Sequence, residues 1–218
     1  MAKNKLGIFV TGTDTDVGKT YISEALIKHF CRQGFQTVGM KPIAAGAEIE
    51  NGRLLNADVK AIVSASNVDA PIDQINPYVF APAIAPHIAA QQVGIEIAIE
   101  PIMSAFKALK QQADLIVVEG AGGFLVPINE TLTMGDLAKA LDVSVVLVVG
   151  VRLGCISHAL LTVQSIEAKG LHLIGWVANR IEPNMPAIEE NIATLKAMIK
   201  APCIADVAWN EEPSFSQI

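Results

Sequence analysis

The chain has 218 residues, of which 51% are hydrophobic and 17% charged, and its net charge is −6. This composition excludes a disordered tail, and the length suits one α/β domain with a core of its own. Because the balance is acidic and the sequence contains no basic run, we expect no nucleic acid as the main partner. We interpret residues 1–218 as a single domain.

The sequence contains no pattern typical of a membrane or secreted protein. The apolar run at 143–151 is interrupted by a serine and a glycine and is shorter than the roughly 18 residues of a span. The first five residues lead directly into a strand pattern, without the features of a secretory signal. Cys31, Cys155 and Cys203 lie far apart, with neither metal-binding spacing nor a disulfide framework. We therefore expect a cytoplasmic protein with no membrane partner.

Runs rich in β-branched residues alternate with helical patterns along the chain. We predict strands at residues 7–11, 37–41, 115–119, 145–149, 173–178 and 203–207. We predict helices at residues 19–33, 57–66, 95–112, 134–141, 156–169 and 186–199. Strands such as 145–149 are apolar on both faces, as in parallel strands covered on both sides. The pattern predicts an α/β fold, a doubly wound, mostly parallel sheet with helices on both faces.

The first strand leads into Thr-Gly-Thr-Asp-Thr-Asp-Val-Gly-Lys-Thr at 11–20, and a helical pattern follows. This is the layout of a phosphate-binding loop (P-loop), in which backbone N–H groups, the lysine and the threonine hydroxyl bind a triphosphate and Mg²⁺. The standard loop has four residues between its first glycine and Gly-Lys, whereas five separate Gly12 from Gly18 here. We therefore predict a P-loop NTPase-like protein whose loop, with Asp14 and Asp16, is of an atypical subtype.

Ligands of doubly wound sheets bind beyond the carboxyl ends of the strands. Five predicted strands place a polar residue or a glycine at or just after that end, namely Thr11, Lys41, Glu119, Gly150 and Asn179. We interpret residues 67–86, which are rich in Pro, Ala and Asn, as an irregular connection over this rim.

Three charged residues are candidates for chemistry. Glu119 follows four apolar strand residues, as does the second magnesium-binding acid of P-loop enzymes, although it could instead cap the next turn. Lys41 could form a two-cation pocket with Lys19 that stabilises a transferring phosphoryl group, or it could be a solvated strand-end lysine. Asp58 starts a helical pattern, where an acid commonly interacts only with the helix dipole.

Two features of the second half could also bind ligands. The strand-to-helix junction at 149–158 offers free N–H groups to a carboxylate. Cys155 has the location of an activated thiol at a helix N-terminus, but it lacks an evident base, so we favour a packed small residue. Asn179 can offer a donor and an acceptor to a purine edge.

In this order, the motifs resemble those of the dethiobiotin synthetase family, the ATP-dependent carboxylases of biotin synthesis. The resemblance runs from about residue 6 to about residue 209, and the set in register is more specific than any single motif. The matching segments are 12–20, Lys-Pro at 41–42, Asn-Pro-Tyr at 76–78, Pro-His at 86–87, Val-Glu-Gly-Ala-Gly-Gly at 118–123, 148–156 and Gly-Trp-Val-Ala-Asn at 175–179.

The resemblance implies a reaction of ATP, CO₂ and 7,8-diaminopelargonic acid. CO₂ adds to one amine to give a carbamate, and the carbamate oxygen attacks the γ-phosphate of ATP. The resulting carbamic–phosphoric anhydride is attacked by the second amine, which closes the ureido ring of dethiobiotin and releases phosphate.

The resemblance also implies roles for individual residues and a homodimer. Lys19 and Lys41 are the catalytic cations, while Thr20, Asp58 and Glu119 hold Mg²⁺. The ATP-binding residues it implies are Asp16, Val17, Gly18, Lys19, Thr20, Tyr21, Asp58, Glu119, Gly120, Ala121, Gly122, Asn179, Arg180, Ala208, Trp209 and Asn210. The substrate-binding residues it implies are Thr15, Lys41, Ala45, Gly122, Arg152, Leu153, Gly154, Cys155 and Ser157. The junction at 152–157 of one subunit would receive the carboxylate of the substrate bound in the other.

The sequence departs from the family pattern at three of these positions. Asp16 stands where the family commonly has Glu, Ala45 where it has Ser, and Ser157 where it has Asn. None of these departures removes a metal ligand or a lysine, so they concern substrate affinity and not the reaction itself.

Two other classes of protein remain as alternatives. One is a partitioning or positioning ATPase, a dimerisation switch without ligase activity, whose loop carries a signature lysine where this chain has Asp14. The other is a domain that binds nucleotide without carboxylating anything. The presence of Lys41, Asp58 and Glu119 together argues against such a binder.

Overall fold

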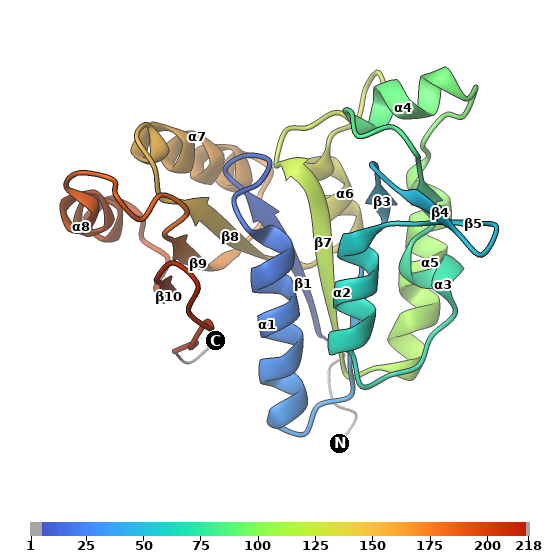
Figure 1. Ribbon diagram of the computed structural model, residues 1–218, viewed down its shortest axis with the longest axis horizontal. Coiled ribbons are helices and arrows are strands. Elements are labelled where there is room, and N and C mark those ends of the chain that lie inside the picture. Colours follow the sequence, from blue (N-terminus) through green and yellow to red (C-terminus); the bar gives the residue numbers. More distant parts are fainter. Residues whose placement is uncertain (1–5, 217–218) are drawn as a thin grey trace.

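A six-stranded parallel sheet forms the centre of the computed structural model, which describes residues 6–216 (Figure 1). The strand order is β10-β9-β8-β1-β7-β2, and every pairing within it is parallel. The strands are β1 (Leu6–Gly12), β2 (Thr37–Met40), β7 (Leu115–Gly123), β8 (Ser144–Gly150), β9 (Leu173–Asn179) and β10 (Cys203–Val207). The predicted α/β architecture is therefore confirmed.

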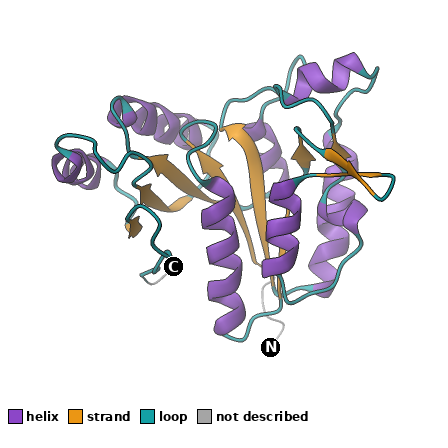
Figure 2. Cartoon of the chain, in the orientation of Figure 1, coloured by secondary structure: helices purple, strands orange, loops and turns teal. Residues whose placement is uncertain are grey.

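Helices cover both faces of the sheet, as Figures 1 and 2 show. On one face lie α1 (Lys19–Arg32) and α2 (Ala57–Ala65), and on the other lie α5 (Ile99–Gln112), α6 (Met134–Leu141), α7 (Cys155–Ala168) and α8 (Ile188–Met198). Successive strand side chains point to opposite faces, so Val117 joins the core under α1 and α2 whereas Val118 joins the core under the other four helices. Two hydrophobic cores thus hold the sheet between two layers of helices.

Several short elements that we had not predicted flank the sheet, and some of them lie within the expected irregular connection. Within residues 67–86 the structure has α3 (Ile72–Ile75) and β6 (Tyr78–Val79), which pairs with β3 (Ile43–Ala44). The hairpin of β4 (Glu48–Glu50) and β5 (Arg53–Leu55) and the helix α4 (Pro86–Gln92) were not predicted either. These elements are short, and β3 and β6 depend on a pairing between distant segments, so local periodicity does not mark them.

Some predicted boundaries were wrong by a few residues. The helix expected from residue 95 begins at Ile99, because Ala98 is extended with φ −103° and ψ 150°. The strand expected to include Lys41 ends at Met40, and the Lys41 N–H donates to the carbonyl of Ile75 (2.9 Å) instead of to the sheet. No helix in residues 6–216 is both long and apolar enough to cross a membrane.

Helix α6 starts in a capping box that also receives an ion pair. The Thr133 and Asp136 side chains each bond the other's backbone N–H, and Lys169 Nζ lies 2.6 Å from Asp136 Oδ1. Although desolvation opposes the change, hydrogen bonds from Lys169 and Thr133 lower the pKa of Asp136 from 3.8 to about 2. The ionised form of Asp136 is therefore the one that stabilises the fold.

Replacing Asp136 by asparagine should lower the free energy of unfolding by about 1 kcal/mol near neutral pH, because the charged cap and the ion pair are lost. The folded-state pKa lies below the unfolded value of 3.8. The difference in unfolding free energy between the native protein and the variant should thus be complete above about pH 5. It should shrink as the pH falls through 4 toward 2. Urea unfolding of both proteins between pH 7 and pH 3 measures this. A difference that stays constant with pH would show that cap geometry, and not charge, is responsible.

Candidate active site

The phosphate loop connects β1 to α1 and is tied to two neighbouring strands. The Thr13 N–H donates to the carbonyl of Val148 (3.0 Å), and the Gly150 N–H donates to Thr13 Oγ1 (3.4 Å). Asn179 Nδ2, at the end of β9, donates to the carbonyl of Val17 (2.8 Å). The loop is thus supported at both of its ends by the carboxyl edge of the sheet.

Two residues of the loop have left-handed backbone conformations. Gly18 caps α1 with φ +86°, and a Cβ added there would lie 2.2 Å from Asn179 Nδ2. Asp16 has φ +57°, a region in which Asp and Asn are among the few tolerated side chains. The longer loop therefore turns twice before the free N–H groups of α1 begin, and it requires glycine at position 18.

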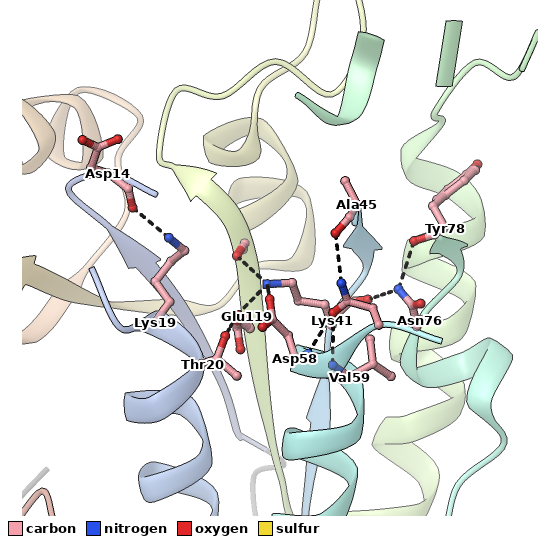
Figure 3. A network of polar contacts seen from close by, with 12 residues as sticks. Asp14, Lys19, Thr20, Lys41, Ala45, Asp58, Val59, Asn76, Tyr78 and Glu119 are labelled. Atoms are coloured by element: carbon pink, nitrogen blue, oxygen red, sulfur yellow. Dashed lines mark hydrogen bonds and ion pairs between the residues drawn. The ribbon is translucent and has the colours of Figure 1, made fainter. Parts of the chain in front are cut away.

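Lys19, the lysine of the phosphate loop, is buried. Its Nζ donates to the main-chain carbonyl oxygen of Asp14 (2.8 Å), as Figure 3 shows. Desolvation, and next the nearby charge of Lys41, lower the pKa of Lys19 from 10.5 to about 8. Lys19 is thus still mostly protonated at neutral pH and is poorly screened by water.

Lys41 lies between two acids at the centre of the site. Its Nζ is 2.5 Å from Glu119 Oε1 and 2.8 Å from Asp58 Oδ2 (Figure 3), and 3.4 Å from the carbonyl oxygen of Gly120. Burial alone would lower the pKa of Lys41, but Glu119 and Asp58 raise it above its usual value. The side chain is only 5% exposed, so the alternative of a solvated strand-end lysine was wrong.

Oxygen atoms from three elements converge beside Lys41. Thr20 Oγ1, in the first turn of α1, donates to Glu119 Oε1 (2.7 Å). Glu119 Oε2 is buried and has no hydrogen-bond partner among residues 6–216. Asp58 is in the first turn of α2, where Asn56 accepts from its N–H (2.9 Å). An unpartnered carboxylate oxygen, a second acid and a hydroxyl form a donor set that Mg²⁺ prefers.

This set contains only two acids. The described part of the chain has no group of three or more His, Cys, Asp or Glu side chains that could hold a metal. The hydroxyl of Thr20 and oxygens of the ligand would therefore have to complete the coordination, as is usual for Mg²⁺ bound with a nucleotide.

A cavity of about 780 Å³ opens in front of these side chains. The predicted residues that line it are Thr15, Asp16, Gly18, Lys19, Thr20, Lys41, Ala45, Asp58, Glu119, Ala121 and Gly122. Residues 83–86 and Val126 form the rest of its wall. The expectation that the 67–86 segment passes over the rim is thus correct for its last residues.

Two asparagines that were not predicted as site residues fix backbone segments beside the cavity. Asn56 Nδ2 donates to the carbonyl of Ala45 (2.9 Å) while its Oδ1 caps α2. Asn76 Nδ2 donates to the carbonyls of Lys41 (2.6 Å) and Tyr78 (2.9 Å). The sequence marks Asn56 by its position just before a helical pattern, and Asn76 by the Asn-Pro-Tyr motif that it begins.

The remaining predicted substrate residues lie at the junction of β8 and α7 and do not line this cavity. Leu153 is exposed, Gly154 has φ +92°, and Cys155 is buried, as expected for a packed small residue. Arg152 forms an ion pair with Asp14 of the phosphate loop. The 152–157 junction therefore contacts the phosphate loop through Arg152, although none of its residues lines the cavity.

The other predicted ATP-binding residues lie in the phosphate loop, in α1 and just after β9 and β10. The Tyr21 hydroxyl donates to the carbonyl of Glu211 (2.7 Å), and Trp209 is 53% exposed. Ala208 and Asn210 flank Trp209 in the same segment, while Val17 is buried in the core beneath the loop. Arg180 is occupied by ion pairs with Asp206 and Glu189.

The parallel sheet, the glycine-containing loop between its first strand and first helix, and the buried lysine define a P-loop NTPase-like protein. FtsY from Elizabethkingia anophelis has this fold with a TM-score of 0.57 at 15% identity, over 99% of this chain and 63% of its own. MinD from Pyrococcus horikoshii superposes with a TM-score of 0.56 at 13% identity, over 93% of this chain and 81% of its own. At such identities the likeness shows the fold alone.

Sequence comparison gives the family. A family model described as an AAA domain matches residues 6–216. The ATP-dependent dethiobiotin synthetase of Aromatoleum aromaticum is 49% identical over 91% of this chain and 88% of its own. Those of Nitrosospira multiformis and Pseudoalteromonas translucida are 48% and 44% identical, over 94% and 96% of this chain. The chain belongs to the dethiobiotin synthetase family.

Proposed function

We propose that the chain carboxylates and cyclises 7,8-diaminopelargonic acid with CO₂ and ATP to give dethiobiotin, ADP and phosphate. The observation that carries this proposal is identity of 44–49% to ATP-dependent dethiobiotin synthetases over at least 91% of the chain. The cavity supports it, because a phosphate loop, two buried lysines, Asp58 and Glu119 lie around one space. Residues 1–218 would act as one P-loop ligase domain in the cytoplasm.

The two lysines would act on the charges that develop during the reaction. One amine bonds to the carbon of CO₂ and loses a proton, which gives a carbamate anion beside the ammonium of Lys41. The carbamate oxygen then bonds to the γ-phosphorus as the bond to ADP breaks, and Lys19 stabilises the charge of the transferring group. The second amine finally attacks the carbamate carbon, loses a proton and expels phosphate. Poorly solvated ammonium groups stabilise these anions more strongly than water would.

Thr20, Asp58 and Glu119 would hold Mg²⁺, which neutralises charge on the β- and γ-phosphates. Their oxygen donors fit the ion, as the unpartnered Oε2 of Glu119 indicates. The chain itself contributes the orientation of these groups, since Asn56 fixes the turn that carries Asp58.

Replacing Glu119 by glutamine should raise the Mg²⁺ concentration at half-effect by at least about tenfold, because an anionic ligand becomes neutral. The readout is the rise of Tm with Mg²⁺ at a fixed concentration of a non-hydrolysable ATP analogue, which does not depend on turnover. Glu50→Gln, at an exposed acid paired with Lys60, is the control. An unchanged midpoint for the Glu119 variant would remove Glu119 from the metal site.

Adenine would bind near Asn179 and residues 208–210, and the molecule would be a homodimer. The 152–157 junction lies outside the cavity of its own chain, which supports the idea that it serves a partner's substrate. Light scattering of the purified protein tests the assembly, and a monomer with full activity would contradict it.

The function itself is tested by ATP hydrolysis with Mg²⁺ and bicarbonate, with and without 7,8-diaminopelargonic acid, while dethiobiotin is followed by mass. Product that appears only with the diamine would establish the ligase. Steady hydrolysis that is indifferent to the diamine and gives no product would favour a switch ATPase.

A further inference from the structure

Asp14 faces two different parts of the molecule. Its main-chain carbonyl oxygen accepts from Lys19 Nζ (2.8 Å), on the side of the phosphate site. Its carboxylate points away from Lys19 in Figure 3, accepts from the Thr15 N–H through Oδ1 (2.8 Å), and is ion-paired with Arg152 through Oδ2. Asp14 itself does not line the cavity. Within residues 6–216, Asp14 therefore links Arg152 to two cavity residues, Lys19 and Thr15.

Asp14 lies between the two points at which the phosphate loop is bonded to the sheet. The contacts of Thr13 and Val17 hold the two ends of the loop on β8 and β9. Between them, Arg152 is the side chain from outside the loop that bonds Asp14. A carboxylate in a loop that binds a triphosphate would also repel the ligand unless a cation neutralises it.

We propose that Arg152 is a positioning residue of the nucleotide site of its own chain. By holding and neutralising Asp14, it fixes the carbonyl that orients Lys19 and removes the repulsion between Asp14 and the phosphates. This role differs from the contact with a substrate carboxylate that the family resemblance implies for the 152–157 junction. It rests on the nucleotide-binding part of the proposed function and not on the ligase reaction.

The charges predict an asymmetric set of effects. The Arg152 and Asp14 side chains are 40% and 47% exposed, and an exposed ion pair changes an equilibrium by up to about fivefold. Arg152→Gln leaves an uncompensated carboxylate in the loop, so it should weaken binding of an ATP analogue by about three- to fivefold. Asp14→Asn removes that charge and should cost less than about twofold. The double variant should bind the analogue more tightly than Arg152→Gln, because the charge that Arg152 compensates is already gone.

The experiment is calorimetric titration of these variants with a non-hydrolysable ATP analogue and with AMP, in Mg²⁺ and without diamine. AMP lacks the β- and γ-phosphates that the loop lysine reaches, so its affinity should not change, whereas a general loss of structure would weaken both ligands. Arg152→Lys keeps the charge and should bind like the native protein. Lys60→Gln is the matched control, because it breaks a similarly exposed pair with Glu50, 47% and 41% exposed.

Suppression of the Arg152→Gln defect by Asp14→Asn would support the proposal. Unchanged analogue affinity in Arg152→Gln, with only a higher KM for the diamine, would overturn it and leave Arg152 as a substrate contact. Additive losses in the double variant would also overturn it. Failure of the native protein itself to bind the analogue would instead overturn nucleotide binding, and this inference with it.

Discussion

Replacing Lys41 by methionine should lower kcat for dethiobiotin formation by at least about 100-fold, because a preorganised cation is lost where the carbamate and the transferring phosphoryl group develop charge. Methionine keeps much of the length of the side chain and removes its charge. The affinity for an ATP analogue should change far less, since the phosphate loop and Lys19 remain. Single-turnover formation of dethiobiotin, followed by mass, and calorimetric titration separate the two effects.

Stability needs its own measurement in this variant. Lys41 is the counter-ion of buried Glu119 and half-buried Asp58, and breaking a buried pair by removing one partner costs about 3 kcal/mol or more. The double variant Lys41→Met with Glu119→Gln should recover part of this loss of unfolding free energy, but not the activity. Lys60→Met makes the same change at an exposed site. Native kcat in a folded Lys41→Met protein would rule out the catalytic role.

Replacing Gly18 by alanine should weaken binding of an ATP analogue by at least about 100-fold, on the order of 3 kcal/mol. The backbone there has φ +86°, and the new Cβ would lie 2.2 Å from Asn179 Nδ2. The left-handed conformation costs roughly 1–2 kcal/mol for a residue with a side chain. Asn179 must also leave the carbonyl of Val17 that it supports. Calorimetric titration with the analogue measures the loss.

Gly34 provides a matched control for this substitution. It has φ +87°, and a Cβ added there meets nothing within 4 Å. Gly34→Ala therefore has the same backbone strain and should lower the free energy of unfolding by about 1–2 kcal/mol. Its new Cβ collides with no other atom and does not contact the phosphate loop. Its nucleotide affinity should be that of the native protein. If both variants bound the analogue equally well, the contact between Gly18 and Asn179 would not matter for the loop.

Local patterns were sufficient for the main elements of the fold. Helix α6 and strand β10 begin and end at the predicted residues. An apolar stripe marks the helix and a short apolar run marks the strand. The additional strands β3 and β6 could not be predicted in this way. Each has two residues, and each exists because the other lies beside it, 34 or more residues away along the chain.

The sequence by itself determined the kind of site, because parallel strands bring their carboxyl ends to one edge and the polar residues stand at those ends. Only the tertiary structure decided which of them touch. Lys41 meets Glu119 because β2 pairs with β7 in a register that places Met40 opposite Val118.

In the same way, Arg152 pairs with Asp14 because the β8–α7 junction lies beside the phosphate loop. Arg180 forms ion pairs with Asp206 and Glu189. A local hydrophobic pattern specifies which face of a strand is buried. Which strands become neighbours depends on packing between segments far apart in the chain.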